Sequence, residues 1–93
     1  MQPTMTTNGF GNKTWKLHGV FHRTDGPAIE YRYGDKQWCL HGVCHRTDGP
    51  AIEYADGGKS WYLHGIWLSF AEWLDQTPDM TDEEKVMYKL EHG

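Results

Sequence analysis

Residues 17–31 read Leu-His-Gly-Val-Phe-His-Arg-Thr-Asp-Gly-Pro-Ala-Ile-Glu-Tyr, and residues 40–54 repeat them with one change, Cys44 in place of Phe21. Chance does not produce such a match, so this repeat decides how the chain is organised. A third copy opens at residues 61–66 and then departs from the pattern. The same interval of 23 residues separates three tryptophans, Trp15, Trp38 and Trp61.

Each unit of the repeat is expected to form a β-hairpin. Residues 28–31 and 37–40 alternate between their two faces with period two, which is typical of strands. Gly34 and Asp35 lie between them and tolerate the positive φ angles of a tight turn. A ten-residue connection over 18–27 joins one unit to the next, and its Asp-Gly-Pro ends the turn.

These hairpins predict a mainly β (α+β) fold, an antiparallel meander of about six strands. One unit is two strands wide, so equivalent residues form rows spaced by roughly 10 Å. Trp15, Trp38 and Trp61 are expected to ladder along one face. Trp38 would then be the centre of stability, because it has a ladder neighbour on each side.

The last third of the chain predicts two short helices that cap the sheet. Ser69 with Glu72 and Thr81 with Glu84 both match the capping box, and Pro78 separates the two segments. We therefore expect a single domain over residues 1–93. It divides into a β-repeat array over about 9–66 and a helical cap over 67–93.

Composition narrows the range of functions. Nine Lys and Arg against thirteen Asp and Glu give a net charge of −4, the wrong sign for a protein that binds free duplex DNA. No apolar run reaches the eighteen or so residues of a membrane helix, and residues 1–10 lack the charged and apolar regions of a signal peptide, so a soluble, unexported protein is expected. The two cysteines, Cys39 and Cys44, are expected to be free thiols in a reducing cytoplasm.

The motif Gly-Val-x-His-Arg-Thr-Asp-Gly-Pro-Ala-Ile-Glu-Tyr-x-x-Gly-x-Lys-x-Trp resembles the MORN-like β-hairpin repeats, in particular a variant of bacterial and tailed-phage proteins. The likeness covers roughly residues 9–66. It implies a module for binding and assembly in which glycines set turns and aromatic rings stack across hairpins. The His-Arg-Thr-Asp loop and the helical tail depart from ordinary MORN repeats. The resemblance suggests a small phage protein that inhibits a host protein, for instance one of a defence system.

One group of side chains in the connecting loop is a candidate binding site. It is present twice, as His22, Arg23, Asp25 and as His45, Arg46, Asp48. The binding hypothesis is that Arg23 and Arg46 project from one edge as a basic strip. The structural alternative is that each arginine is held by the aspartate of its own loop.

Other chemistry is not favoured. His18 and His22 have a spacing found in zinc sites, but a single loop offers too few ligands, so no metal and no cofactor are expected. Cys44 beside His45 is only adjacency in sequence, so the chain is expected not to be an enzyme. Two functions stay open. One is a protein-interaction module that binds a host protein, and the other is a repeat that binds an anionic nucleotide or RNA through its His/Arg loops. Homo-oligomers through a strand edge or the helical tail are a further expectation.

Overall fold

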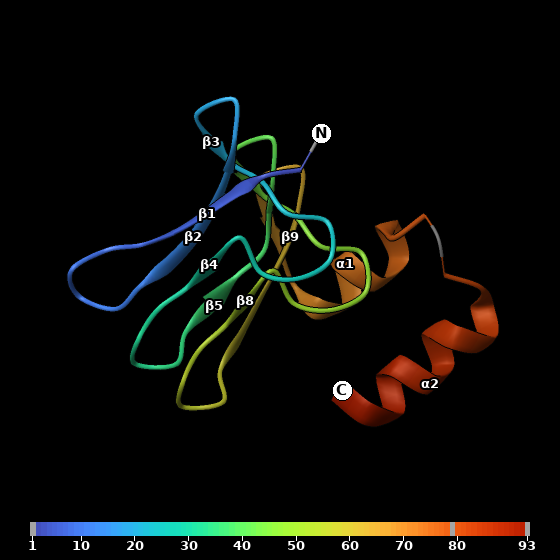
Figure 1. Cartoon of the computed structure of the whole chain (residues 1–93). Coiled ribbons are helices and arrows are strands. Elements are labelled where there is room, and N and C mark those ends of the chain that lie inside the picture. Colours follow the sequence, from blue (N-terminus) through green and yellow to red (C-terminus); the bar gives the residue numbers. More distant parts are fainter. Residues whose placement is uncertain (1, 79, 93) are drawn as a thin grey trace.

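The computed structural model describes residues 2–78 and 80–92, which form a twisted antiparallel sheet followed by two helices (Figure 1). The predicted mainly β fold with C-terminal helices is therefore confirmed. Its ten short strands are β1 (Thr4–Thr7), β2 (Lys13–Leu17), β3 (Val20–Phe21), β4 (Ile29–Glu30), β5 (Lys36–Gln37), β6 (Cys39–Leu40), β7 (Val43–Cys44), β8 (Ile52–Glu53), β9 (Lys59–Leu63) and β10 (Ile66–Leu68).

The main sheet has the strand order β1-β2-β4-β5-β8-β9-β10, and every pairing is antiparallel. β3 pairs with β2 off this path, and β6 with β7 forms a separate ribbon. β1 begins before the expected start of the array near residue 9, because Thr4–Thr7 adds an edge strand to β2. The described chain thus has more and shorter strands than the six that the repeat predicts.

The predicted turns lie at one end of the hairpins. Tyr31 donates its backbone N–H to Asp35 O at 2.9 Å, and Gly34 has a φ of 112°. Tyr54 bonds Gly58 O in the same way in the next unit, at 2.9 Å. Asp35 also accepts the N–H of Ala55 through its carboxylate at 2.7 Å, so the turn of one unit is tied to the next.

A second kind of turn lies at the opposite end, where sequence reasoning predicted only a connecting loop. His18 and Gly19 have φ angles of 53° and 82°, and His41, Gly42, His64 and Gly65 repeat this geometry. Two successive residues with positive φ are the requirement of a type I′ hairpin turn. Histidine is enriched in this region of φ, and glycine enters it freely. The expectation of a loop over 18–27 is therefore wrong in its first half, which contains β3.

The predicted tryptophan ladder is not formed. Among the described residues, no other aromatic ring stacks on Trp15 or Trp38. An arginine covers each ring instead, with Cζ of Arg23 at 3.9 Å from the Trp15 ring and Cζ of Arg46 at 3.7 Å from the Trp38 ring. Rows spaced by roughly 10 Å leave a gap that indole rings alone do not bridge, and a guanidinium group fills part of it.

The core lies at the end of the array, under the first helix. α1 (Phe70–Gln76) begins at Ser69 with the predicted capping box, since Ser69 accepts from Glu72 N and Glu72 accepts from Ser69 N. Trp73 of α1 is fully buried, with its ring 4.5 Å from that of Trp61 on β9. Leu74, Leu63 and Leu68 complete the buried cluster.

The second helix, α2 (Asp82–His92), follows α1 at the C-terminal end of the chain (Figure 1). Thr81 and Glu84 form the predicted reciprocal cap. Val86, Met87 and Leu90, which form an apolar stripe along α2, are exposed. Tyr88 makes the contact with α1, because its ring lies 5.6 Å from that of Trp73. Neither helix, in the part of the chain described, is long and apolar enough to span a bilayer.

We expect Trp73→Ala to lower the free energy of unfolding by about 3–5 kcal/mol, because it empties the largest fully buried site. Trp38→Ala should cost less, since that ring is partly exposed and packs under an arginine. Urea denaturation of both variants measures the difference. A larger loss for Trp38→Ala would contradict the placing of the stability centre at Trp73.

Candidate functional site

The two candidate loops have the same internal contacts. In the first, Arg23 donates from Nε to Asp25 at 2.9 Å and from Nη1 to Pro27 O at 3.1 Å. Nη1 also lies 3.4 Å from the carboxylate of Glu30 on β4. These bonds fix the guanidinium plane over the ring of Trp15 at the start of the unit.

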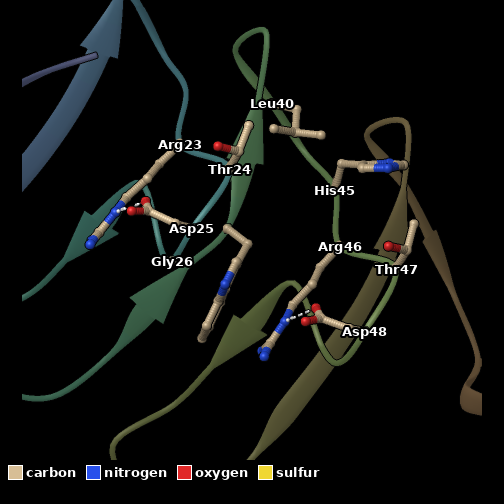
Figure 2. Close-up of a pocket in the computed structure, with 10 residues that line it drawn as sticks. Arg23, Thr24, Asp25, Gly26, Leu40, His45, Arg46, Thr47 and Asp48 are labelled. Atoms are coloured by element: carbon tan, nitrogen blue, oxygen red, sulfur yellow. Dashed lines mark hydrogen bonds and ion pairs between the residues drawn. The ribbon is translucent and has the colours of Figure 1, made fainter. Parts of the chain in front are cut away.

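The second loop repeats this arrangement at the interval of 23 residues. Arg46 donates to Asp48 at 2.8 Å, to Pro50 O at 3.1 Å and to Glu53 at 2.8 Å. Figure 2 shows the Arg23–Asp25 and Arg46–Asp48 pairs side by side in the same orientation. Both arginine side chains are mostly covered, with 20% and 18% of their surface exposed. Sequence reasoning missed the two glutamates, although each follows its arginine by seven residues in both copies.

The glycine of each Asp-Gly-Pro has a packing role. A Cβ atom on Gly26 would lie 2.9 Å from Cζ of Arg23, and one on Gly49 would lie 2.7 Å from Cζ of Arg46. Neither glycine has a positive φ. The motif therefore needs glycine here because the guanidinium packs directly on the backbone, and not because a turn demands an unusual conformation.

The loops do not form the basic strip of the binding hypothesis. Two arginines face four carboxylates, those of Asp25, Glu30, Asp48 and Glu53. The aspartates are the accessible members, since 83% of each side chain is exposed. The surface that the loops present is therefore acidic, which agrees with the structural alternative for the arginines.

His22 and His45 hold neighbouring units together. Nδ1 of His22 accepts the backbone N–H of His41 at 3.0 Å, and Nδ1 of His45 accepts that of His64 at 2.9 Å. Each pair of imidazole rings is also in contact, with centroids 4.7 and 4.6 Å apart. The two predicted binding histidines thus act as hydrogen-bond acceptors for the type I′ turn of the next unit.

A groove separates the two loops. Its volume is about 490 Å³. The lining residues are Arg23, Thr24, Asp25, Gly26, Trp38, Leu40, His45, Arg46, Thr47 and Asp48 (Figure 2). All of the predicted site residues except His22 line it. Thr24, Thr47, Trp38 and Leu40 were not predicted, because nothing in the sequence alone shows which side chains face the space between two copies.

A second hollow of about 480 Å³ follows the first along the array. Part of its lining repeats that of the first groove at the interval of 23 residues. The equivalent positions are Thr24 and Thr47, Leu40 and Leu63, and His45 and Leu68. Gln76 and Pro78 replace the third Arg-Asp loop there, so this hollow is more apolar. The first groove is the one with two charged walls.

The buried thiol of Cys39 is a weak nucleophile in this geometry. Cys39 and Cys44 are opposite each other on β6 and β7, and both are free. Burial, followed by the charge of Cys44, raises the pKa of Cys39 to about 12. Such a thiol stays protonated near pH 7 and is a poor nucleophile. Lys16 and Phe21 occupy the same cross-strand positions in the first unit.

No set of metal ligands is found either. Within residues 2–78 and 80–92, no group of three or more histidine, cysteine or acidic side chains is placed to hold a metal ion.

Comparison of the chain with protein-family models, curated proteins and solved structures gives no match. The function has to be inferred from the groove and from the chemistry of its walls.

The His45 bond makes stability depend on pH. Burial, and secondly the charge of His64, lower the pKa of His45 below its ordinary value of 6.5. As the pH falls below about 6.5, the unfolded chain therefore takes up this proton before the folded chain does. The stability contributed by neutral His45 is present above that pH and is lost in the window beneath it.

We expect the urea concentration at the unfolding midpoint to decrease as the pH is lowered from 7.5 to 5.5. Protonation of His45 Nδ1 removes the acceptor for the backbone N–H of His64. His45→Asn keeps an acceptor oxygen without titrating, so it should reduce this pH dependence. His18→Asn is the matched control at an exposed histidine and should leave it unchanged. Equal slopes for wild type and His45→Asn would contradict the assignment.

Proposed function

We propose that this protein is a non-enzymatic interaction module that binds another protein in the groove between its two Arg-Asp loops. The observation that carries the proposal is the groove itself, about 490 Å³ between two loops with the same set of arginine contacts. Its rim exposes the carboxylates of Asp25 and Asp48, and its lining includes Trp38 and Leu40. Protein-binding sites combine such apolar and aromatic surface with a polar rim.

The charge of the loops favours a protein over a nucleotide or RNA. An anionic ligand needs uncompensated arginine or lysine, since phosphate contacts supply most of its affinity. Each arginine here already bonds two carboxylates and a backbone carbonyl. A phosphate in the groove would meet two exposed aspartates, so the geometry disfavours the RNA alternative.

The non-enzymatic part of the proposal is supported by the state of the reactive side chains. Imidazoles of His22 and His45 are used as acceptors, and the Cys39 thiol is held protonated. The resemblance to MORN-like repeats of bacterial and phage proteins leads us to propose a host protein in the cytoplasm as the partner, which the module would inhibit by occupying one of its surfaces.

The test is quantitative capture of proteins from host lysate with three baits. Thr24 is exposed on a wall of the groove, so Thr24→Arg should fill the groove without unfolding the protein. Thr7→Arg makes the same change on exposed β1 and is the matched control. We expect a protein that wild type and Thr7→Arg retain equally and that Thr24→Arg loses at least about ten-fold, or 1.4 kcal/mol.

Two results would contradict the proposal. One is an identical set of captured proteins for all three baits, which would move the site away from the groove. The other is capture of RNA or nucleotide that depends on Thr24, because the groove would then be the anion site of the alternative. Melting temperatures of the three baits show whether any loss arises from unfolding.

A further inference from the structure

The two cysteines form a pair across the ribbon of β6 and β7, and the proposed function makes no use of it. Cys39 and Cys44 stand directly opposite each other in the register of the ribbon, and both are free thiols. Opposite residues of an antiparallel pair place their side chains on the same face. In the first unit these two positions bring Nζ of Lys16 to 5.1 Å from the centre of the Phe21 ring, so side chains at this register interact.

The backbone of the ribbon sets the distance between the two cysteines. His45, the residue after Cys44, donates its backbone N–H to Trp38 O at 3.1 Å. Hydrogen-bonded and non-hydrogen-bonded pairs alternate along an antiparallel ladder, so the neighbouring pair of cysteines is of the non-hydrogen-bonded kind. Such a pair has its Cα atoms about 4.5 Å apart, and disulfides span roughly 4.4–6.8 Å. The backbone therefore permits a disulfide at this place.

The sulfur atoms interact as well. Gln37 donates from Nε2 to Sγ of Cys44 at 2.9 Å. Burial is the main cause that raises the pKa of Cys39 to about 12, the charge and hydrogen bonding of Cys44 raise it further, and a hydrogen bond with Gln37 acts in the opposite direction. Each thiol is thus in reach of the other and of the same amide group.

We propose that Cys39 and Cys44 are a site of reversible oxidation, at which hydrogen peroxide converts the two thiols into a disulfide across the ribbon. The bond between the sulfurs forms while two S–H bonds and the O–O bond of the peroxide break. The sulfurs lose two electrons to the peroxide oxygens, and the two thiol protons leave in two molecules of water. This modification does not depend on the proposed function of the groove.

The different exposure of the two thiols sets the order of the steps. Cys39 is 2% exposed and Cys44 is half-buried, so peroxide reaches Cys44 first and forms a sulfenic acid there with release of one water. Cys39 then attacks that sulfur, and the hydroxide that leaves takes up the Cys39 proton as the second water. Little Cys39 thiolate exists near pH 7, but its position opposite the target compensates for this. We therefore expect a slow reaction that ends at the disulfide.

The disulfide would join strands that already connect the second unit to both of its neighbours. Cys39 O accepts the N–H of Arg23 at 3.1 Å, and Cys44 O accepts that of Gly65 at 2.8 Å. The ribbon also carries Leu40 of the groove. Oxidation should therefore shift the amide NMR signals of the ribbon together with those of Arg23 and Gly65.

The test is incubation of the whole reduced protein with hydrogen peroxide, followed by alkylation in denaturant and mass spectrometry. We expect the loss of both alkylatable thiols in a chain whose mass is lower by two hydrogen atoms. Both sulfurs should lie in one tryptic peptide, residues 37–46, and dithiothreitol should restore the two thiols. NMR of the labelled protein before and after oxidation checks the expected shifts.

Two variants test the geometry. Cys39→Ala leaves the more accessible thiol alone, so peroxide should give a sulfenic acid at Cys44 that dimedone traps in higher yield than in wild type. Val43→Cys with Cys44→Ala keeps two thiols but places the second on the opposite face of the ribbon, so no disulfide should form within the chain.

The inference is overturned if wild type keeps both thiols in excess peroxide, or if its products are sulfinic acid or disulfides between chains. An equal yield of disulfide within the chain from Val43→Cys with Cys44→Ala would also overturn it, because the register of the ribbon would then not be what brings the sulfurs together.

Discussion

The contact of an arginine with a tryptophan, Arg23 over Trp15 and Arg46 over Trp38, is the interaction on which the rest of the structure depends. A cation over an indole ring contributes about 0.5–2 kcal/mol, and more as water is excluded. Arg23 and Arg46 are each about four-fifths covered, and Glu30 and Glu53 are the less exposed of their carboxylate partners. Together these contacts fold a polar loop back over the sheet and give each unit an apolar interior that its short strands alone do not provide.

The end of the array follows from the loss of this contact. The position equivalent to Arg46 in the third unit is Ser69, which begins α1 in place of a loop. Trp61 then has no arginine from its own unit, and the indole of Trp73 covers its ring instead. The helix is therefore the substitute for a third Arg-Asp loop, and the core is densest where the repeat stops. Because α1 stands in place of a third Arg-Asp loop, the groove with a charged loop on each side lies between the first two loops.

Sequence reasoning predicted the features that depend on local chemistry. The capping boxes at Ser69 and Thr81 and the turn at Gly34 each need only neighbours within four residues, and all are present. The His-Gly turn was missed because a left-handed conformation is uncommon for histidine, although His-Gly after a leucine occurs three times in the sequence. Trp73 is fully buried, and its place over Trp61 depends on how the helix packs on the sheet and not on neighbours in the sequence.

The loops singled out in the sequence line the groove, but their electrostatics differ from the basic strip of the binding hypothesis. Arg23 and Asp25 are close in sequence, so their pairing could be weighed in advance. Glu30 lies on the following strand, and its approach depends on how the loop folds over Trp15. With Glu30 added to Asp25, the carboxylates around Arg23 outnumber its positive charge, and the edge is acidic where the sequence suggested a basic strip. The spacing of these residues along the chain does not predict this contact.

A double-mutant cycle between Trp38 and Arg46 tests most directly whether the arginine–tryptophan contact stabilises the unit. Trp38→Leu and Arg46→Met keep apolar volume while removing the ring and the cation, and urea denaturation gives the free energy of unfolding of each single and double variant. The account requires a coupling energy of about 1 kcal/mol or more, because the two groups lie 3.7 Å apart and are shielded together. Additive effects, with a coupling below about 0.3 kcal/mol, would show that the arginine does not hold the unit together and would contradict it.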